Sequence, residues 1–348
     1  MVMIKKLVLL SIPILIFNCT KVEKIYLLPD RAEIVEAIHD VIVRDGVFSI
    51  DGLNDANTYS LKYSSSSLSK ALFPDTLAKD FSKIKIGRNI SQVIDTTILY
   101  DIKWDSAYVD VKYTLRGSLK IVILDDSTHY ITTTRPDTNY INDTTYVVTT
   151  KIDTVGSSIM SFPVDSIVKS FTHNTSQKAI FLRTQNSNNA SKDWKLAKIT
   201  PIIFESTQDY FYIKKVSINS SGTPSNVTIP AQTDTDPLLT YLNRDSLPLI
   251  NYNNAVTVSA VEVENDDPYP EEPGELVMVH FGHGVNIYKV REPLTDVSNT
   301  GSHSGSFNVT SHGKKIYRLF IDLIDYRTIF TATGSYNAQI WMIPFQVP

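Results

Sequence analysis

Histidine side chains are the most conspicuous candidates for chemistry in this sequence. His280 and His283 stand three residues apart, and His303 and His312 follow. Imidazole nitrogens are common zinc ligands. On a strand, however, residues three apart point to opposite faces, so His280 and His283 do not converge on one ion. No HExxH motif is present. We therefore interpret these histidines as turn and strand-edge residues and predict no metal site from them.

The segment 262–275 carries the densest run of negative charge. Its carboxylates alternate with prolines and a tyrosine. Clustered carboxylates can bind Ca²⁺ through their oxygens, but the EF-hand spacing is missing. Prolines stiffen such a segment and favour an extended, solvated loop. We interpret 262–275 as an acidic loop, with calcium binding left open as the alternative.

The sequence contains no motif specific enough to identify a catalytic nucleophile. The segment GSHSG at 301–305 has the glycine spacing of a nucleophile elbow, but His303 stands where that motif requires serine. The chain has no P-loop and no dinucleotide-binding fingerprint. A carboxylate pair for glycoside hydrolysis is defined in space and stays open. We name no catalytic residue and expect no cofactor.

Aromatic side chains are the remaining candidates for ligand binding. Those on the expected strands of the first half are Tyr100, Trp104, Tyr113 and Trp194. Tyrosine and tryptophan are enriched in binding surfaces because a large apolar body carries a polar tip. The alternative is that they pack in the core of a sheet.

Residues 1–19 have the order of an export signal. Lys5 and Lys6 precede an apolar run that ends at Cys19, the only cysteine of the chain. The run is shorter than the roughly 20 residues of a membrane-spanning helix and has the layout of a secretory signal. It resembles the signal of bacterial lipoproteins, although Phe17 and Asn18 stand where that family usually has a small residue. The resemblance implies lipidation of Cys19 and a membrane anchor in the bacterial cell envelope, at the outer membrane or facing the periplasm. Without the lipid, the protein would be secreted or periplasmic.

Composition limits the remaining possibilities. The net charge of −4 gives no basic surface, so we expect no nucleic-acid partner. After the signal no cysteine remains to form an internal disulfide. Because single cores stop growing near about 250–300 residues, a chain of 348 residues predicts two domains.

The first expected domain covers residues 29–206 and follows a tether at 20–28. Asp30 and Glu33 have the spacing of a helix cap, and an apolar stripe continues to Gly46. Strict alternation over 108–124 predicts a half-buried strand. The threonine-rich insert at 125–160 predicts a projecting hairpin, with its turn at 135–139.

This order of elements resembles the NTF2-like (SnoaL-like) fold, an α+β cone in which a helix packs across a curved antiparallel sheet. The resemblance also rests on an irregular helical stretch at 68–81 and on a final strand that begins at Trp194. It implies a pocket inside the cone. The family includes isomerases, dehydratases and non-catalytic modules, and no catalytic motif of the family matches here.

The second expected domain, residues 207–348, contains shorter strands separated by turns. Val256 and Val258 alternate with polar residues, and the apolar phase then slips to Val261 and Val263, which predicts a β-bulge. Several such strands favour an all-β sandwich. The architecture resembles the immunoglobulin-like (Ig-like) β-sandwich modules of exported bacterial proteins.

These features favour a non-catalytic, lipid-anchored envelope protein that binds a protein or glycan partner. The alternative is a small-molecule-binding or enzymatic NTF2-like pocket, and a third possibility is a structural spacer. A cone filled by leucine, isoleucine and phenylalanine would favour the binding module. A trio of polar side chains facing into a deep cone would favour the pocket.

Overall fold

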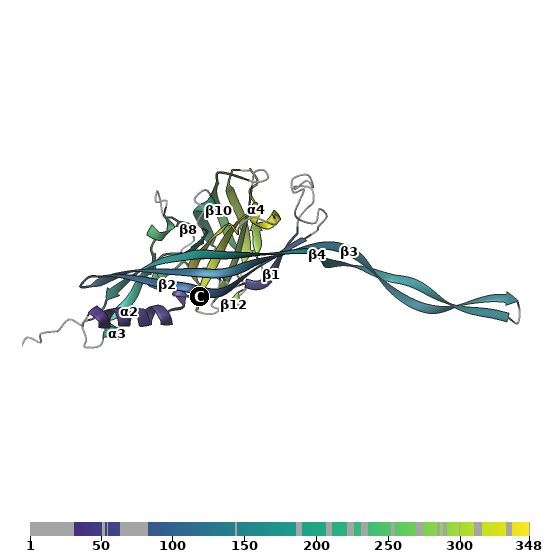
Figure 1. Ribbon diagram of the computed structural model, residues 1–348, viewed down its shortest axis with the longest axis horizontal. Coiled ribbons are helices and arrows are strands. Elements are labelled where there is room, and N and C mark those ends of the chain that lie inside the picture. The colour runs from purple at the N-terminus through teal and green to yellow at the C-terminus, as the bar shows by residue number, and fades with distance from the viewer. Residues whose placement is uncertain are drawn as a thin grey trace, which may run out of the picture.

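Two antiparallel β-sheets make up most of the protein in the computed structural model (Figure 1). The structure describes residues 31–50, 53, 55–62, 83–142, 145–185, 190–206, 211–220, 226–230, 236–251, 255–268, 274–283, 286–287, 291–298, 300–309, 315–331 and 336–347. The larger sheet has 12 strands in the main order β1-β2-β3-β4-β6-β16-β15-β11-β12, and the smaller has four in the order β14-β10-β7-β8. No helix in these ranges is long and apolar enough to cross a membrane.

The strands are β1 (Asp55–Lys62), β2 (Lys83–Ile102), β3 (Ser106–Asn142), β4 (Thr145–Arg183), β5 (Trp194–Ile199), β6 (Ile202–Glu205), β7 (Phe211–Ser220), β8 (Asn226–Ile229), β9 (Leu242–Asn243), β10 (Ala255–Asn265), β11 (Glu275–His283), β12 (Asn286–Ile287), β13 (Glu292–Leu294), β14 (Ser302–Asn308), β15 (Lys315–Asp325) and β16 (Ala338–Val347). The helical elements are α2 (Arg31–Arg44), α3 (Ala190–Asp193), α4 (Tyr326–Phe330) and the 3₁₀ turns η1 (Gly46–Phe48), η3 (Pro237–Leu239) and η4 (Arg244–Ser246).

Strands β16, β15 and β11 form a central layer that is buried on both faces. In β16 nearly every side chain from Ala338 to Val347 is buried. A strand covered on both faces needs no polar alternation and reads as a continuous apolar run. The sequence AQIWMIPFQV has this character because its odd and even positions enter different cores.

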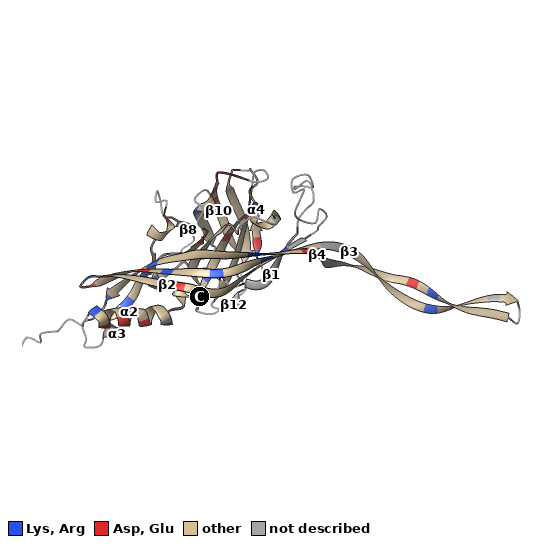
Figure 2. Ribbon diagram, in the orientation of Figure 1, with Lys and Arg blue, Asp and Glu red and all other residues tan. Residues whose placement is uncertain are grey.

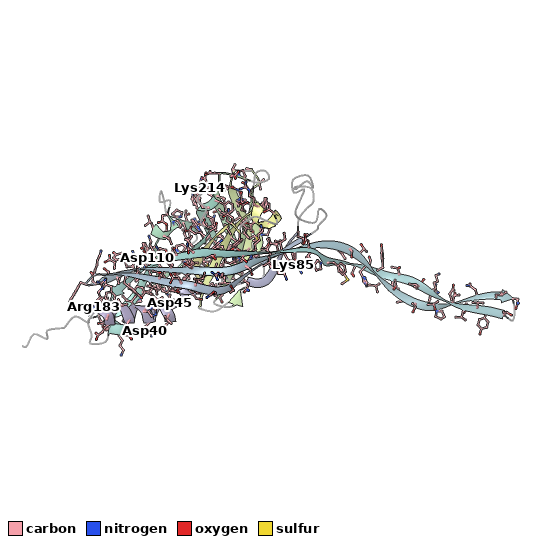
Figure 3. All side chains as sticks on the ribbon, viewed as in Figure 1. Asp40, Asp45, Lys85, Asp110, Arg183 and Lys214 are labelled. Atoms are coloured by element: carbon pink, nitrogen blue, oxygen red, sulfur yellow. The ribbon has the colours of Figure 1, made fainter. Side chains whose placement is uncertain are left out.

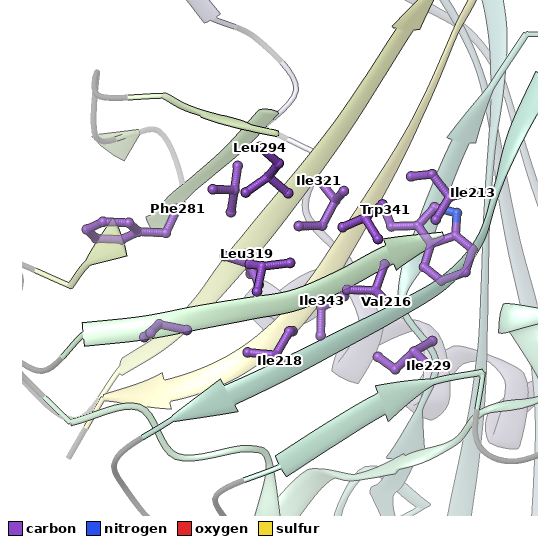
Figure 4. Close-up of a cluster of buried hydrophobic side chains, with 14 of the residues drawn as sticks. Ile213, Val216, Ile218, Ile229, Phe281, Leu294, Leu319, Ile321, Trp341 and Ile343 are labelled. Carbon is purple, nitrogen blue, oxygen red and sulfur yellow. The ribbon is translucent and has the colours of Figure 1, made fainter. Parts of the chain in front are cut away.

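The first of these cores, the sandwich core, lies between the central layer and the four-stranded sheet (Figure 4). Leu319, Ile321, Trp341 and Ile343 pack there against Ile213, Val216 and other side chains of the smaller sheet. The middle core lies on the opposite face of the central layer, where Met278, Phe320, Ile340 and Met342 pack against the inner side of β2–β4. The protein body is therefore three layers of sheet.

Helix α2 covers one end of the large sheet. Ile34, Ile38 and Ile42 are buried on one stripe of the helix, as the spacing predicts. They pack with Phe48, Phe181 and other apolar side chains in a third cluster, the helix core. At the end of this segment, Arg244 binds Asp45 through a 3.1 Å contact between Nε and Oδ2.

The expected fold class is wrong in its α+β part. Strands β2–β4 do not form an NTF2-like cone with a helix across it, and the chain is all-β. Strand β6 pairs with β4 on one side and with β16 on the other, so the larger sheet runs through both halves of the chain. The sandwich of the second half consequently shares this sheet with the first half instead of forming a separate Ig-like sandwich. Strands from both sides of the boundary expected at residue 206 thus belong to the larger sheet.

Several local predictions are confirmed. Val109, Val111 and Leu115 are buried in β3, whereas Lys112 and Arg116 are exposed. The register of β10 shifts after Val258, where the apolar phase slips in the sequence. The expected helical stretch at 68–81 and the residues 1–28 lie outside the described ranges.

Candidate interaction surface

Strands β3 and β4 leave the body of the protein as a long twisted ribbon, here called the arm (residues 125–142 and 145–162; Figure 1). Strand β2 accompanies β3 only as far as the pair Lys83–Leu124, and beyond it β3 pairs with β4 alone. At about 3.3 Å per residue the arm extends roughly 60 Å. The predicted projecting hairpin is thus confirmed, but residues 135–139 belong to strand β3 and do not form its turn.

The composition of the arm explains why it stands free. Threonine, valine and isoleucine favour the extended backbone because branched side chains fit a pleated strand. The body strands bury one face, whereas no described side chain from 127 to 142 or from 145 to 160 is buried. Side chains stand on both sides of the ribbon (Figure 3). A two-stranded ribbon without a core is only marginally stable by itself, so covering one face would stabilise it.

The two faces of the arm differ in charge. Directly opposed residues of an antiparallel pair share a face, so the register assigns each side chain to one face or the other. One face, here called the uncharged face, carries these described pairs: Thr128–Ile159, Tyr130–Ser157, Thr132–Thr154, Thr134–Ile152, Pro136–Thr150 and Thr138–Val148. The opposite, charged face carries His129, Arg135, Asp137, Lys151 and Asp153. Figure 2 shows the arm mostly without charge, apart from a short stretch that holds both signs.

Large apolar side chains are solvent-exposed along the uncharged face. Tyr130 is 61% exposed and Ile152 is 65% exposed, and Val148 and Ile159 are exposed as well. The charged face also bears apolar residues such as Ile131, but there Arg135 forms an ion pair with Asp153. Several large apolar side chains exposed on one face without charge are a feature of interaction sites.

The four aromatic residues that the sequence singled out do not gather around a cavity. Trp194 is buried in the helix core, and Tyr100 and Tyr113 pack against the same cluster. Partial burial raises the pKa of both tyrosines. Trp104 lies apart in the turn between β2 and β3, 61% exposed, and the Arg183 guanidinium lies 5.4 Å from its ring centre.

The described histidine side chains do not gather at a common site either. His280 is buried in β11 and stacks on Phe320, with 4.4 Å between ring centres. His303 is buried and its Nε2 lies 3.1 Å from Oε1 of Glu275. The side chain of His283 and all of His312 lie outside what the structure describes. No group of metal-binding side chains gathers within the described ranges.

His280 belongs to a buried ionic cluster that the sequence did not reveal. Asp322 Oδ2 lies 3.2 Å from Nη1 of Arg291 and 3.7 Å from Nδ1 of His280, and Asp322 Oδ1 lies 3.7 Å from Nη2 of Arg88. Burial alone would raise the pKa of Asp322, but Arg291 and Arg88 hold it below its usual value. Burial and Arg291 lower the pKa of His280 well below its ordinary value, which keeps that ring neutral. The cluster joins β2, β11 and β15 inside the body. The one sequence signal for it is a carboxylate within an apolar run.

Four described carboxylates of the acidic segment 262–275 have partners within the protein. Glu262 lies 3.0 Å from Lys215, Asp267 lies 2.9 Å from Arg327, and Glu264 pairs with Lys214. Glu275 also accepts a 2.8 Å hydrogen bond from Nδ2 of Asn265. These contacts link the segment to β7 and α4.

Neither a protein-family model nor a curated protein matches this sequence. The candidate surface therefore rests on the geometry of the arm alone. The sequence predicted that the arm projects, but the separation of charge between its faces depends on the β3–β4 register. That register carries a bulge between Ile131 and Thr132, so uninterrupted alternation does not give it.

Proposed function

We propose that this protein is a lipid-anchored, non-catalytic component of the bacterial cell envelope that binds a macromolecular partner through its arm. The observation that carries the proposal is the projecting ribbon whose one face carries only uncharged side chains in its described pairs, among them the exposed Tyr130, Val148, Ile152 and Ile159. The described part of the arm has no hydrophobic core of its own. Its exposed side chains can be buried only against a surface outside the body.

The interior of the body supports binding over pocket chemistry. The space between β2–β4 and the central layer is filled by apolar side chains, among them Leu115, Leu119, Ile121, Phe171 and Phe204. An apolar filling of this kind favours a binding module over a ligand-binding cone. The buried ionic cluster also lies within this packed region.

The position of the arm fits an anchored protein. Helix α2, which begins 12 residues after Cys19, lies at the end of the body opposite to the arm (Figure 1). A lipid on Cys19 would place that end near the membrane. The arm would then point away from the membrane, toward partners.

An arm-shortened variant tests the proposal. Asp126 and Ser161 are directly paired, so residues 127–160 can be replaced by Asn-Gly, the favoured two-residue hairpin turn. We expect the variant to keep its fold and its membrane attachment, but to migrate as a smaller complex in native electrophoresis of solubilised membranes. We expect Cys19→Ala to show the opposite behaviour: an intact arm, with loss from the membrane fraction or blocked processing.

Two results would overturn the proposal. One is an arm-shortened variant that retains every assembly of the native protein. The other is a Cys19→Ala variant that remains membrane-bound with normal processing. Circular dichroism of both variants controls for loss of fold.

A further inference from the structure

The arrangement of large and small side chains on the uncharged face indicates what kind of surface can pack against it. Three described pairs on this face join a larger side chain with a smaller one: Thr128 with Ile159, Tyr130 with Ser157, and Thr134 with Ile152. The remaining pairs, such as Thr138 with Val148, join side chains of similar size. The larger residue lies on β4 in the pairs of Ile159 and Ile152 and on β3 in the pair of Tyr130 with Ser157. At these pairs a protruding side chain on one strand therefore lies beside a small side chain on the other strand.

Such a surface complements a copy of itself. When two ribbons stack face to face around a two-fold axis that runs along them, β3 of one copy lies over β4 of the other at the same height. Ile152 of one copy then lies over Thr134 of its partner, and Tyr130 lies over Ser157. Two-fold interfaces require this kind of self-complementarity. Because the described pairs from Thr128–Ile159 to Thr138–Val148 carry no charge, stacking them on a second copy brings no like charges together.

We propose that two copies of this chain bind each other through the uncharged faces of their arms. The inference rests on the proposed function of the arm as a binding element and names its partner as a second copy. Stacking turns two marginal ribbons into a four-stranded sandwich with a buried interior, the arrangement in which β-ribbons become stable.

The described pairs of the uncharged face offer a small area for this association. They span residues 128–138 of β3, roughly 36 Å, so a face about 10 Å wide offers on the order of 400 Å² per copy. Stable interfaces between freely diffusing proteins bury about 600–1,000 Å² per partner. A common membrane anchor raises the effective concentration of the two copies, which favours pairing through a smaller area.

Photo-crosslinking in intact cells tests the partner directly. The full chain carries p-benzoylphenylalanine at Tyr130, on the uncharged face, and is co-expressed with a tagged copy that lacks the crosslinker. We expect a band at twice the chain mass that contains the tagged copy. The matched control places the crosslinker at Ile131, 50% exposed on the charged face, and should give little of this band.

Paired substitutions test the face. Ile152→Glu puts a charge on the uncharged face, where stacking would bury it, so the crosslinked fraction should fall about tenfold or more. Ile131→Glu makes the same change on the charged face and should leave the crosslinked fraction within about twofold, since that position stays solvated.

The outcomes separate this inference from the proposed function. A Tyr130 crosslink to a different protein overturns self-pairing but leaves the arm as a binding element. The absence of any Tyr130 crosslink overturns both. Equal loss of the dimer band with Ile152→Glu and Ile131→Glu overturns the assignment to the uncharged face.

Discussion

His173 shows how a single buried side chain couples the middle core to pH. Its ring stacks on Tyr336, with 4.9 Å between ring centres, and its Nε2 donates a 3.2 Å hydrogen bond to the Tyr336 carbonyl. Burial, assisted by the nearby charge of Arg88, lowers the pKa of His173 from 6.5 to about 4, against the opposing effect of that hydrogen bond. The ring is therefore neutral in the folded protein at pH values where the unfolded chain would protonate it.

This difference predicts a loss of stability in acid. Between pH 6.5 and 4 the unfolded chain binds more protons than the folded protein, so the free energy of unfolding falls as the pH falls through that window. His173 alone contributes about 3 kcal/mol of this loss, and His280, whose pKa shifts in the same direction, adds to it. Urea unfolding at a series of pH values, followed by fluorescence of the buried Trp341, measures the slope.

The variant His173→Phe isolates the contribution of this residue. Phenylalanine keeps the aromatic packing but cannot titrate, so the decline between pH 6.5 and 4 should be shallower than in the native protein. Its stability at pH 7 serves as its own reference. A variant that follows the native pH profile would show that the burial of His173 is not coupled to acid unfolding.

At the scale of elements, the central layer is buried on both faces. Truncations on either face of its strands should therefore be destabilising, unlike those on the solvent face of a half-buried strand. Ile340 and Ile343 of β16 are both fully buried but enter different cores, the middle core and the sandwich core. Truncation of a fully buried isoleucine costs about 2–5 kcal/mol. We therefore expect Ile340→Ala and Ile343→Ala to lower the free energy of unfolding by comparable amounts in this range.

Val93 in β2 provides a control position on a solvent-exposed strand face. Its side chain is 45% exposed, so Val93→Ala should change the free energy of unfolding by no more than about 0.5 kcal/mol. Denaturation curves of the three variants make the comparison. If Ile340→Ala is as mild as Val93→Ala, β2–β4 do not pack on the central layer as described.

The sequence predicted elements better than their assembly. Alternation identified β3, and the phase slip identified the bulge in β10, because both signals are local. The layer arrangement depends on β6 pairing with both β4 and β16, a contact between distant segments that no local pattern reveals. The NTF2-like expectation failed for this reason: helix α2 and long strands were predicted correctly, but their partners were not. The aromatic residues likewise carried no signal to separate buried Trp194 from exposed Trp104.

At the scale of the whole molecule, the anchor and the arm together constrain how two copies can meet. Helix α2 and the arm lie at opposite ends of the body, so copies anchored in one membrane through Cys19 would both direct their arms away from it. Their two-fold axis would then run along the arms. The side chains of the uncharged face require the same axis. Large side chains lie over small ones of the partner only when β3 of one copy lies over β4 of the other, and only this axis gives that arrangement. An antiparallel pair would instead place β3 over β3.

The position of the intermolecular crosslink distinguishes the two arrangements. Trypsin cleaves after Lys120, Lys151 and Lys169, so the peptide 121–151 contains the arm part of β3, and the peptide 152–169 contains Ser157 of β4. With the crosslinker at Tyr130 and a tagged copy that lacks it, we expect the dimer band to join Tyr130 to the peptide 152–169 of the tagged copy. This follows because parallel stacking puts Tyr130 over Ser157. A crosslink to the tagged peptide 121–151 would instead indicate antiparallel arms, which copies anchored in a single membrane cannot form without reversing one body. In that case the arm would connect copies held on facing surfaces.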